Sequence, residues 1–122
     1  MIKGMGIDIV ELKRIEAIVT RQPTFVERIL TEKEQRIYNQ LNAKKRKQEF
    51  LAGRFAAKEA FSKANGTGIG KLSFLDMEIL PNKDGAPILS ATTLKGDKCF
   101  VSISHSDEYA IAQVIIQMES AY

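Results

Sequence analysis

The chain has 122 residues, of which 44% are hydrophobic and 27% charged, and its net charge at pH 7 is +3. This composition is that of an ordinary globular domain, and the length leaves room for one domain over residues 1–122. The single cysteine excludes an intramolecular disulfide, and no signal-peptide pattern is present. No apolar run comes near the roughly 20 residues of a membrane span. The sequence therefore argues against secreted, disulfide-rich and membrane proteins and favours the cytoplasm.

Residues 1–9 are expected to form a strand, because apolar side chains alternate there with very small ones. The apolar positions are Met5, Ile7 and Ile9. Glycines at positions 4 and 6 leave the other face bare up to Asp8, which indicates that another backbone or a ligand comes close. A helix over residues 10–19 is expected next, with Leu12, Ile15 and Ile18 or Val19 on its buried stripe.

Three further helices are predicted from capping and stop signals. Thr24 is placed to cap a short helix that carries apolar residues up to Leu30. The segment 31–34, with sequence TEKE, is typical of a capping box and opens a helix through Leu41. The longest helix is expected over residues 45–65, and Gly66 is a normal helix stop.

Beyond this helix the pattern changes to the period of two that is typical of strands. Residues 74–79 alternate in this way, the turn at 82–85 reverses the chain, and a return strand begins at Ile88. Two last strands are expected over 98–104 and 109–118, joined by a tight turn. This order predicts an α+β fold, an antiparallel sheet packed with one long helix and shorter helices, rather than a doubly wound parallel sheet.

The long helix has an unusual second face, which holds small residues and a phenylalanine where charged residues are expected. This face consists of Ala52, Phe55, Ala56, Glu59 and Lys63. It indicates that a second surface contacts the helix closely. Glu59 and Lys63 stand one turn apart, either as a surface ion pair or as a carboxylate held near a phosphate with a lysine beside it.

Asp8 is a second candidate, at the expected junction of strand and helix. One interpretation is a helix N-cap with Glu11 as its capping-box partner. The other is that Asp8 and a second carboxylate face one gap, where they repel each other unless a cation lies between them. Oxygen ligands and retained water suit Mg²⁺, whereas one cysteine and one histidine cannot make a zinc site.

The positive charge is unevenly distributed along the chain. Cations are dense between residues 14 and 63, and none occurs from residue 100 to the end. The run 44–47 either serves the C-terminus of the preceding helix or forms a phosphate-binding rim with Arg54 and Lys58. His105, at a strand end, is either an ordinary turn residue or an anion contact.

Three motifs in this order resemble the holo-[acyl-carrier-protein] synthases, the short, single-domain branch of the 4′-phosphopantetheinyl transferases. They are Gly6-Ile7-Asp8, the helical segment Phe55-Ala56-Ala57-Lys58-Glu59-Ala60, and Ser102-Ile103-Ser104-His105. The resemblance covers essentially the whole chain. It implies transfer of 4′-phosphopantetheine from coenzyme A to a serine of apo acyl carrier protein, with release of adenosine 3′,5′-bisphosphate, a step of fatty acid biosynthesis.

The resemblance also implies residue roles. Asp8 and Glu59 match the Mg²⁺ ligands, and Lys63 is placed to contact the diphosphate and stabilise the leaving group. The base that accepts the serine proton is left open between a metal-bound water and one of the two carboxylates. Contacts to coenzyme A are implied for Arg54, Ser62 and His105, for Lys45 or Arg46 at its 3′-phosphate, and for the turn 82–87 near its adenine.

The family's short form implies a homotrimer with sites at subunit interfaces, which fits the small-residue face around Glu59. An acidic carrier protein is expected to dock on cations of the helices flanking Asp8, namely Lys13, Arg14, Arg21 and Arg28.

Two rival classes stay open, a Mg²⁺-dependent nuclease and a small basic nucleic-acid-binding module. No helix-turn-helix or basic-aromatic surface supports the second class, so a nucleic acid is not expected as partner. A membrane is not expected either, because no apolar run is long enough to span one.

Overall fold

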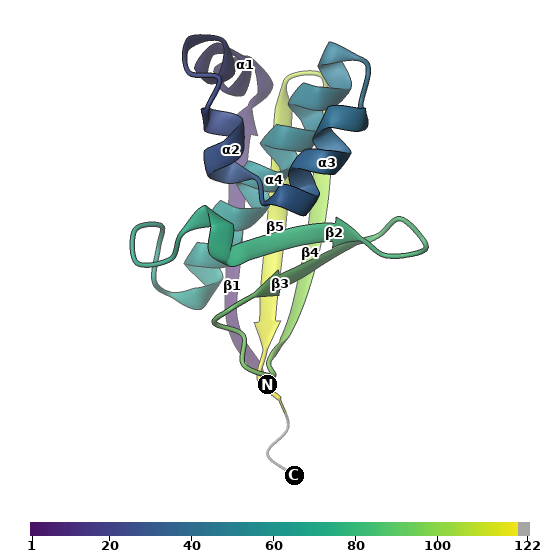
Figure 1. Cartoon of the computed structure of the whole chain (residues 1–122). Helices are drawn as coiled ribbons and strands as arrows, with labels where there is room; N and C mark the ends of the chain where they lie inside the picture. The colour runs from purple at the N-terminus through teal and green to yellow at the C-terminus, as the bar shows by residue number, and fades with distance from the viewer. Residues whose placement is uncertain (120–122) are drawn as a thin grey trace.

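The computed structural model describes residues 1–119 and combines two antiparallel sheets with one long and three short helices (Figure 1). The long helix α4 runs behind the hairpin of the smaller sheet and along the larger sheet. In chain order the elements are β1 Ile2–Glu11, α1 Leu12–Arg21, α2 Phe25–Ile29, α3 Glu32–Gln40, α4 Lys44–Asn65, the 3-10 helix η1 Phe74–Asp76, β2 Met77–Pro81, β3 Pro87–Ala91, β4 Lys98–His105 and β5 Tyr109–Gln117. The predicted α+β fold is confirmed.

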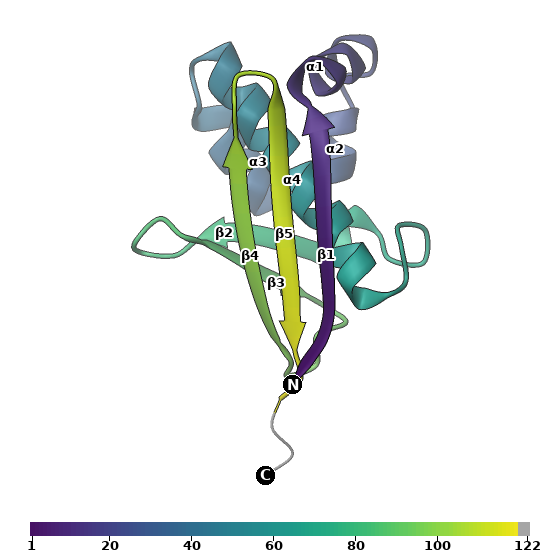
Figure 2. The same cartoon turned by 180° about the vertical axis from the view of Figure 1, so that it is seen from behind.

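The larger sheet places the first strand beside the last one. Its order is β1-β5-β4, and both pairs are antiparallel, with Ile9 opposite Ile111 and Ser102 opposite Gln113 (Figure 2). Strands β2 and β3 form the separate two-stranded sheet that crosses α4 on the other side. The sequence predicted one antiparallel sheet without its strand order, because pairing between distant strands depends on contacts that local periodicity does not contain.

The glycines of β1 allow the strand to lie directly on α4. A β-carbon at Gly4 would overlap the carbonyl oxygen of Ala64, and one at Gly6 would overlap that of Ala60. The close backbone approach predicted from these glycines is therefore that of the chain's own helix. This packing brings Asp8, which follows on the same face of β1, to the side of α4.

Helix α4 is surrounded along its second half, as its small second face predicted. Ala52, Ala56 and Ala60 are fully buried within the single chain. The ring of Phe55 packs against Phe25 of α2 and Phe74 of η1, with ring centroids 6.0 and 5.5 Å apart. The second surface is therefore built from this chain's own elements, so the small-residue face no longer argues for an interface between subunits.

Helix boundaries correct one interpretation of Asp8. Strand β1 continues to Glu11, which occupies the N-cap of α1 without a side-chain capping bond, and Asp8 lies inside the strand. The N-cap interpretation of Asp8 is therefore wrong. It failed because the pairing of β1 with β5 extends the strand beyond its alternating segment.

The other boundaries follow their local signals with small shifts. The capping box of Thr31 and Glu34 is present with both of its hydrogen bonds, and Gly66 ends α4 with φ at 81°. Thr24 holds the N-cap position of α2 but makes no side-chain capping bond. Residues 74–76 form a 3-10 turn instead of the expected strand, because Ser73 and Asp76 make a capping box of their own.

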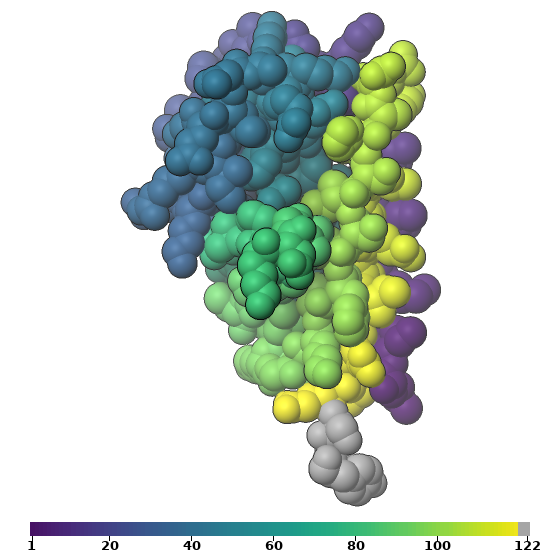
Figure 3. Space-filling model, turned by 90° about the vertical axis from the view of Figure 1, so that its right-hand side faces the viewer, coloured from purple at the N-terminus to yellow at the C-terminus, as the bar shows by residue number. Residues whose placement is uncertain are grey.

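The outer face of the larger sheet is apolar and uncovered within the described chain. Met5, Ile7 and Ile9 of β1 are 61%, 55% and 61% exposed, and Phe100 of β4 is 53% exposed. Figure 2 shows this face toward the viewer, with all helices behind the sheet, and in Figure 3 the side chains of β1 protrude along it. An exposed apolar face of this kind is typical of a protein–protein interface.

Candidate functional site

The first part of the site is the junction between β1 and α4. Lys63 Nζ donates to the carbonyl oxygen of Ile7 at 2.9 Å and lies 3.3 Å from Asp8 Oδ1. The ion pair of Lys63 is thus made with Asp8 across the junction, and among the described residues it forms none with Glu59 one turn before it. The surface Glu59–Lys63 pair is therefore wrong for this chain, and the lysine ties the strand to the helix.

Glu59 and Asp8 share the electrostatic environment of this junction. Partial burial, and then the negative charge of Asp8, raise the pKa of Glu59 above its usual value, while Lys63 and Arg14 oppose the rise. Two carboxylates that disfavour each other's charge are relieved when a cation binds between them. The junction therefore fits a cation bound by oxygen ligands.

The donor set suits Mg²⁺ better than a metal held by protein ligands alone. Within residues 1–119 no group of three or more potential ligands from His, Cys, Asp and Glu occurs. Mg²⁺ is usually held by one or two carboxylates, and water and phosphate oxygens complete its coordination. Asp8 and Glu59 provide this number of carboxylates and leave positions for a phosphorylated substrate.

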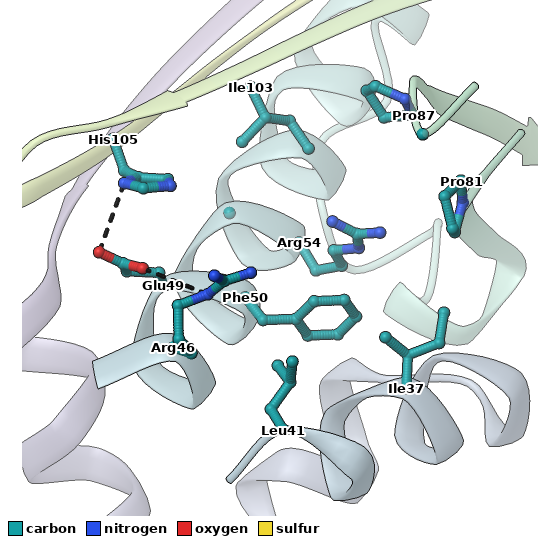
Figure 4. Close-up of a pocket in the computed structure, with 12 residues that line it drawn as sticks. Ile37, Leu41, Arg46, Glu49, Phe50, Arg54, Pro81, Pro87, Ile103 and His105 are labelled. Atoms are coloured by element: carbon teal, nitrogen blue, oxygen red, sulfur yellow. Dashed lines mark ion pairs between the residues drawn. The ribbon is translucent and has the colours of Figure 1, made fainter. Parts of the chain in front are cut away.

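The second part of the site is a basic pocket of about 350 Å³ along the first half of α4 (Figure 4). Its walls come from α3, α4, the hairpin of β2 and β3, and β4, and Figure 3 shows that hairpin projecting between the helices and β4. Residues of all four lie in its lining, which comprises Ile37, Leu41, Arg46, Glu49, Phe50, Gly53, Arg54, Pro81, Gly85, Pro87, Ile103 and His105. The structure thus brings Arg46, Arg54 and His105 together, as predicted.

Arg54 is the most constrained cation of this pocket. Its guanidinium lies 4.1 Å from the centroid of the Phe50 ring and donates to the carbonyl oxygen of Ile79 at 3.3 Å. Burial lowers the pKa of Arg54, an effect that Glu34 opposes. Its Nε atom is buried and has no hydrogen-bond partner among the described residues, so a donor is left for a ligand oxygen.

Glu49 is a carboxylate inside this basic pocket. It lies 3.5 Å from His105 Nδ1 and 3.8 Å from Arg46 Nε, and both side chains point toward it in Figure 4. Glu49 was not among the residues predicted from the sequence, although its position three residues after Arg46 was a usable signal. The pocket's hairpin residues were missed as well, except as part of the turn 82–87.

The basic run before the pocket divides between structural and site roles. Lys47 Nζ donates to the carbonyl oxygen of Tyr38 at 2.8 Å, so it serves the C-terminal turn of α3, one of the two predicted alternatives. Lys45 Nζ donates to the carbonyl oxygen of Asp107 at 2.7 Å, beside His105. Lys58, the other rim candidate, is 0% exposed, so its predicted place on a phosphate-binding rim is wrong.

Ser62 is placed away from the basic pocket. Its side chain is 1% exposed, and its hydroxyl donates to the carbonyl oxygen of Glu59 at 2.7 Å within α4. The structure does not bring it to the surface with Arg54 and His105. Serine hydroxyls in helices often donate to the carbonyl oxygen three or four residues earlier in the same helix. The position of a serine on a helical wheel does not show whether it makes this bond or contacts a ligand.

The four cations predicted to dock a partner are exposed on two neighbouring helices. Lys13, Arg14 and Arg21 belong to α1, and Arg28 belongs to α2. Arg14 lies close enough to Glu59 for its charge to oppose the rise in that pKa. This basic surface therefore borders the carboxylate junction.

Comparisons with known proteins show the family of this chain. The family model of the 4′-phosphopantetheinyl transferase superfamily matches residues 4–114. A holo-[acyl-carrier-protein] synthase of Oceanobacillus iheyensis is 55% identical over 96% of this chain and 98% of that protein, and one of Bacillus pumilus is 54% identical over 99% and 100%. The chain therefore belongs to the 4′-phosphopantetheinyl transferase superfamily.

Solved structures narrow the class further. A holo-(acyl-carrier-protein) synthase of Bacillus anthracis, solved in complex with CoA (3′,5′-ADP), matches with a TM-score of 0.89 and 52% identity over 98% of this chain and 99% of that one. The Helicobacter pylori synthase in complex with coenzyme A matches at 0.82 and 39% over 93% and 99%. The chain is thus an enzyme of the holo-[acyl-carrier-protein] synthase type, a transferase. No helix among residues 1–119 is long and apolar enough to cross a membrane.

Proposed function

We propose that this enzyme transfers 4′-phosphopantetheine from coenzyme A to a serine of apo acyl carrier protein, in a Mg²⁺-dependent reaction that releases adenosine 3′,5′-bisphosphate. The observation that carries the proposal is the convergence of Asp8, Glu59 and Lys63 at one junction, on the same helix as a basic pocket. The relatives solved with coenzyme A or its fragment support the choice of this substrate.

The basic pocket would hold the nucleotide end of coenzyme A. Arg46 and the neighbouring Lys45 offer positive charge for the 3′-phosphate, His105 offers an imidazole nitrogen, and Arg54 offers its buried Nε. The proline and glycine residues of the β2–β3 hairpin provide an apolar wall for the adenine. An arginine guanidinium suits a phosphate group because it can donate two parallel N–H···O hydrogen bonds to the phosphate oxygens.

Asp8 and Glu59 would hold Mg²⁺ on the diphosphate. When bound, the ion supplies charge neutralisation at the diphosphate oxygens, as in other phosphoryl transfers. Lys63 is held beside Asp8, where its ammonium group stabilises the charge that develops on the departing phosphate. The serine oxygen forms a bond to the phosphorus of the pantetheine arm, the bond from that phosphorus to the bridging oxygen breaks, and the serine proton leaves to water or a carboxylate.

Assembly as a homotrimer is part of the proposal. The exposed apolar face of β1, β5 and β4 supports it, since large exposed apolar patches are uncommon on monomers and mark protein–protein contacts. The edge of that face adjoins the Asp8 junction, so a neighbouring subunit there would complete the site. The cations of α1 and α2 would meet the acidic carrier protein, mainly by steering its approach.

The test incubates the protein with coenzyme A, Mg²⁺ and apo carrier protein and follows the carrier by mass spectrometry. A mass gain of one phosphopantetheine arm is expected, together with adenosine 3′,5′-bisphosphate in solution and no reaction when Mg²⁺ is chelated. Glu59→Gln is expected to abolish transfer, whereas Glu32→Gln, on the exposed side of α3, is the matched control that retains it. Cleavage of nucleic acid without any mass gain would favour the rival nuclease.

A further inference from the structure

A buried ion pair joins α4 to α3, one residue before Glu59 along α4. Lys58 and Glu34 are both 0% exposed, and Lys58 Nζ lies 2.6 Å from Glu34 Oε1. Removing two charges from water costs about as much as their attraction returns, so a buried pair is weak evidence for stability. Its presence therefore calls for a reason other than stability.

Besides their mutual contact, the two side chains make three hydrogen bonds to the backbone, at the end of α2, at the start of α3 and in β2. Lys58 Nζ donates to the carbonyl oxygen of Ile29 at 2.7 Å, at the end of α2. Glu34 Oε1 also accepts from the backbone N–H of Thr31 at 2.8 Å, and Glu34 Oε2 accepts from that of Ile79 at 2.7 Å. The pair thus joins α2, α3, α4 and β2 at one point.

The contact with Ile79 leads directly to the basic pocket. The Ile79 N–H is bound by Glu34, and the Ile79 carbonyl oxygen is bound by Arg54. Two residues further on, Pro81 begins the part of the hairpin that lines the pocket. One residue of β2 is therefore held through both of its backbone polar groups, by Glu34 of the buried pair and by Arg54 of the pocket.

We propose that Glu34 and Lys58 are positioning residues for the donor substrate, which fix the β2–β3 hairpin and Arg54 at the pocket. The inference rests on the proposed function, because it assigns the pocket to coenzyme A. Both residues act through Ile79 and Arg54 rather than by touching the substrate. Their loss is therefore expected to weaken donor binding and to leave the chemical step at the Asp8 junction largely unchanged.

The experiment compares two double variants, because a single substitution leaves one buried charge unpaired and risks unfolding. Glu34→Leu/Lys58→Met removes both charges and the acceptor for the Ile79 N–H. Glu34→Gln/Lys58→Met also removes both charges but keeps one side-chain oxygen for that N–H, while the Thr31 N–H loses its acceptor in both variants. The two variants have the same charge and similar side-chain volume. A difference between their KM values for coenzyme A therefore reports the effect of the acceptor for the Ile79 N–H. Val114→Ala, a buried position on β5 outside the pocket lining, is the control for general destabilisation.

The expected result is a KM for coenzyme A raised about tenfold or more in the leucine variant, with kcat within about threefold of wild type. The glutamine variant is expected to recover most of this loss, and Val114→Ala is expected to show wild-type KM. Equal KM values for the leucine and glutamine variants, or a wild-type KM for both, would overturn the inference.

A second readout separates this inference from the proposed function. Hydrogen exchange of the Ile79 amide, measured without any substrate, is expected to be fast in the leucine variant and slow in the glutamine variant and the wild type. Equal exchange in both variants would refute the positioning of β2. A wild-type chain that transfers nothing from coenzyme A would instead refute the proposed function, while the exchange result would still decide how Glu34 holds the hairpin.

Discussion

Gly6 of β1 packs directly against the carbonyl oxygen of Ala60 on α4, with no room for a β-carbon between them. Two residues further along the same face of the strand, Asp8 meets Lys63. The distance between strand and helix therefore decides whether the two carboxylates can hold one cation. The glycine is part of the site's construction although it has no functional group.

Gly6→Ala tests this relationship. The added methyl group must push β1 away from α4, which is expected to lower the free energy of unfolding by about 1–3 kcal/mol or more. Transfer activity is expected to fall more than in a variant of equally reduced stability, because Asp8 moves with the strand and away from Glu59. Thermal unfolding and the Mg²⁺ concentration for half-maximal transfer measure the two effects. Leu51→Ala, a buried change on α4 outside the pocket lining, is the control for stability.

Glu59→Gln is expected to stabilise the metal-free protein at neutral pH. The pKa of Glu59 is raised in the folded state, so the folded chain holds this proton more readily than the unfolded chain. The resulting contribution to stability is complete below the unfolded value of 4.5 and is lost as the pH rises through the raised folded value. The ionised carboxylate thus costs stability at neutral pH, and the amide removes this cost.

The measurement is thermal unfolding in the presence of a chelator at two pH values. At pH 7 the Tm of Glu59→Gln is expected to exceed that of the wild type, and the difference is expected to vanish near pH 4, where Glu59 is protonated and isosteric with Gln. Addition of Mg²⁺ is expected to raise the Tm of the wild type alone. A lower Tm for the variant at pH 7 without metal would contradict the electrostatic account.

Ile9→Lys tests the apolar face of the sheet. Ile9 is 61% exposed and stands beside Ile111 of β5, so a lysine there leaves the single chain folded but places a charge in the proposed subunit interface. Sedimentation is expected to change from trimer to monomer, with loss of transfer activity. Glu108→Lys, an exposed charge change in the turn before β5, is the control. A fully active monomer of the variant would show that the site needs no neighbouring subunit.

Lys13→Glu/Arg21→Glu tests the basic surface of α1. Reversing both charges is expected to raise the KM for an acidic carrier protein severalfold and to reduce its dependence on salt, while the KM for coenzyme A changes little. Arg36→Glu on α3 reverses an exposed charge elsewhere and is the control. Unchanged carrier kinetics at low salt would place the docking surface on another part of the molecule.

Local signals in the sequence predicted most of the helices and strands. The Thr31 capping box and the Gly66 stop involve neighbouring residues only, and the structure has both. Local signals failed at the start of α1 and at residues 74–76, where strand pairing and a second capping box decided the backbone. The candidates Asp8, Glu59 and Lys63 were visible because their spacing in a bare strand and a small-faced helix was unusual.

The sequence by itself determined the class of fold, the carboxylates and the cations from which the site is made. Tertiary structure alone decided that Lys63 pairs with Asp8 rather than Glu59, and that Lys58 is buried against Glu34 rather than exposed on a rim. The physical reason is that a charged side chain pairs with the opposite charge that tertiary packing places within contact distance, which sequence spacing does not specify. Residues 24 or 55 positions apart meet only after β1, α3 and β2 have closed around α4.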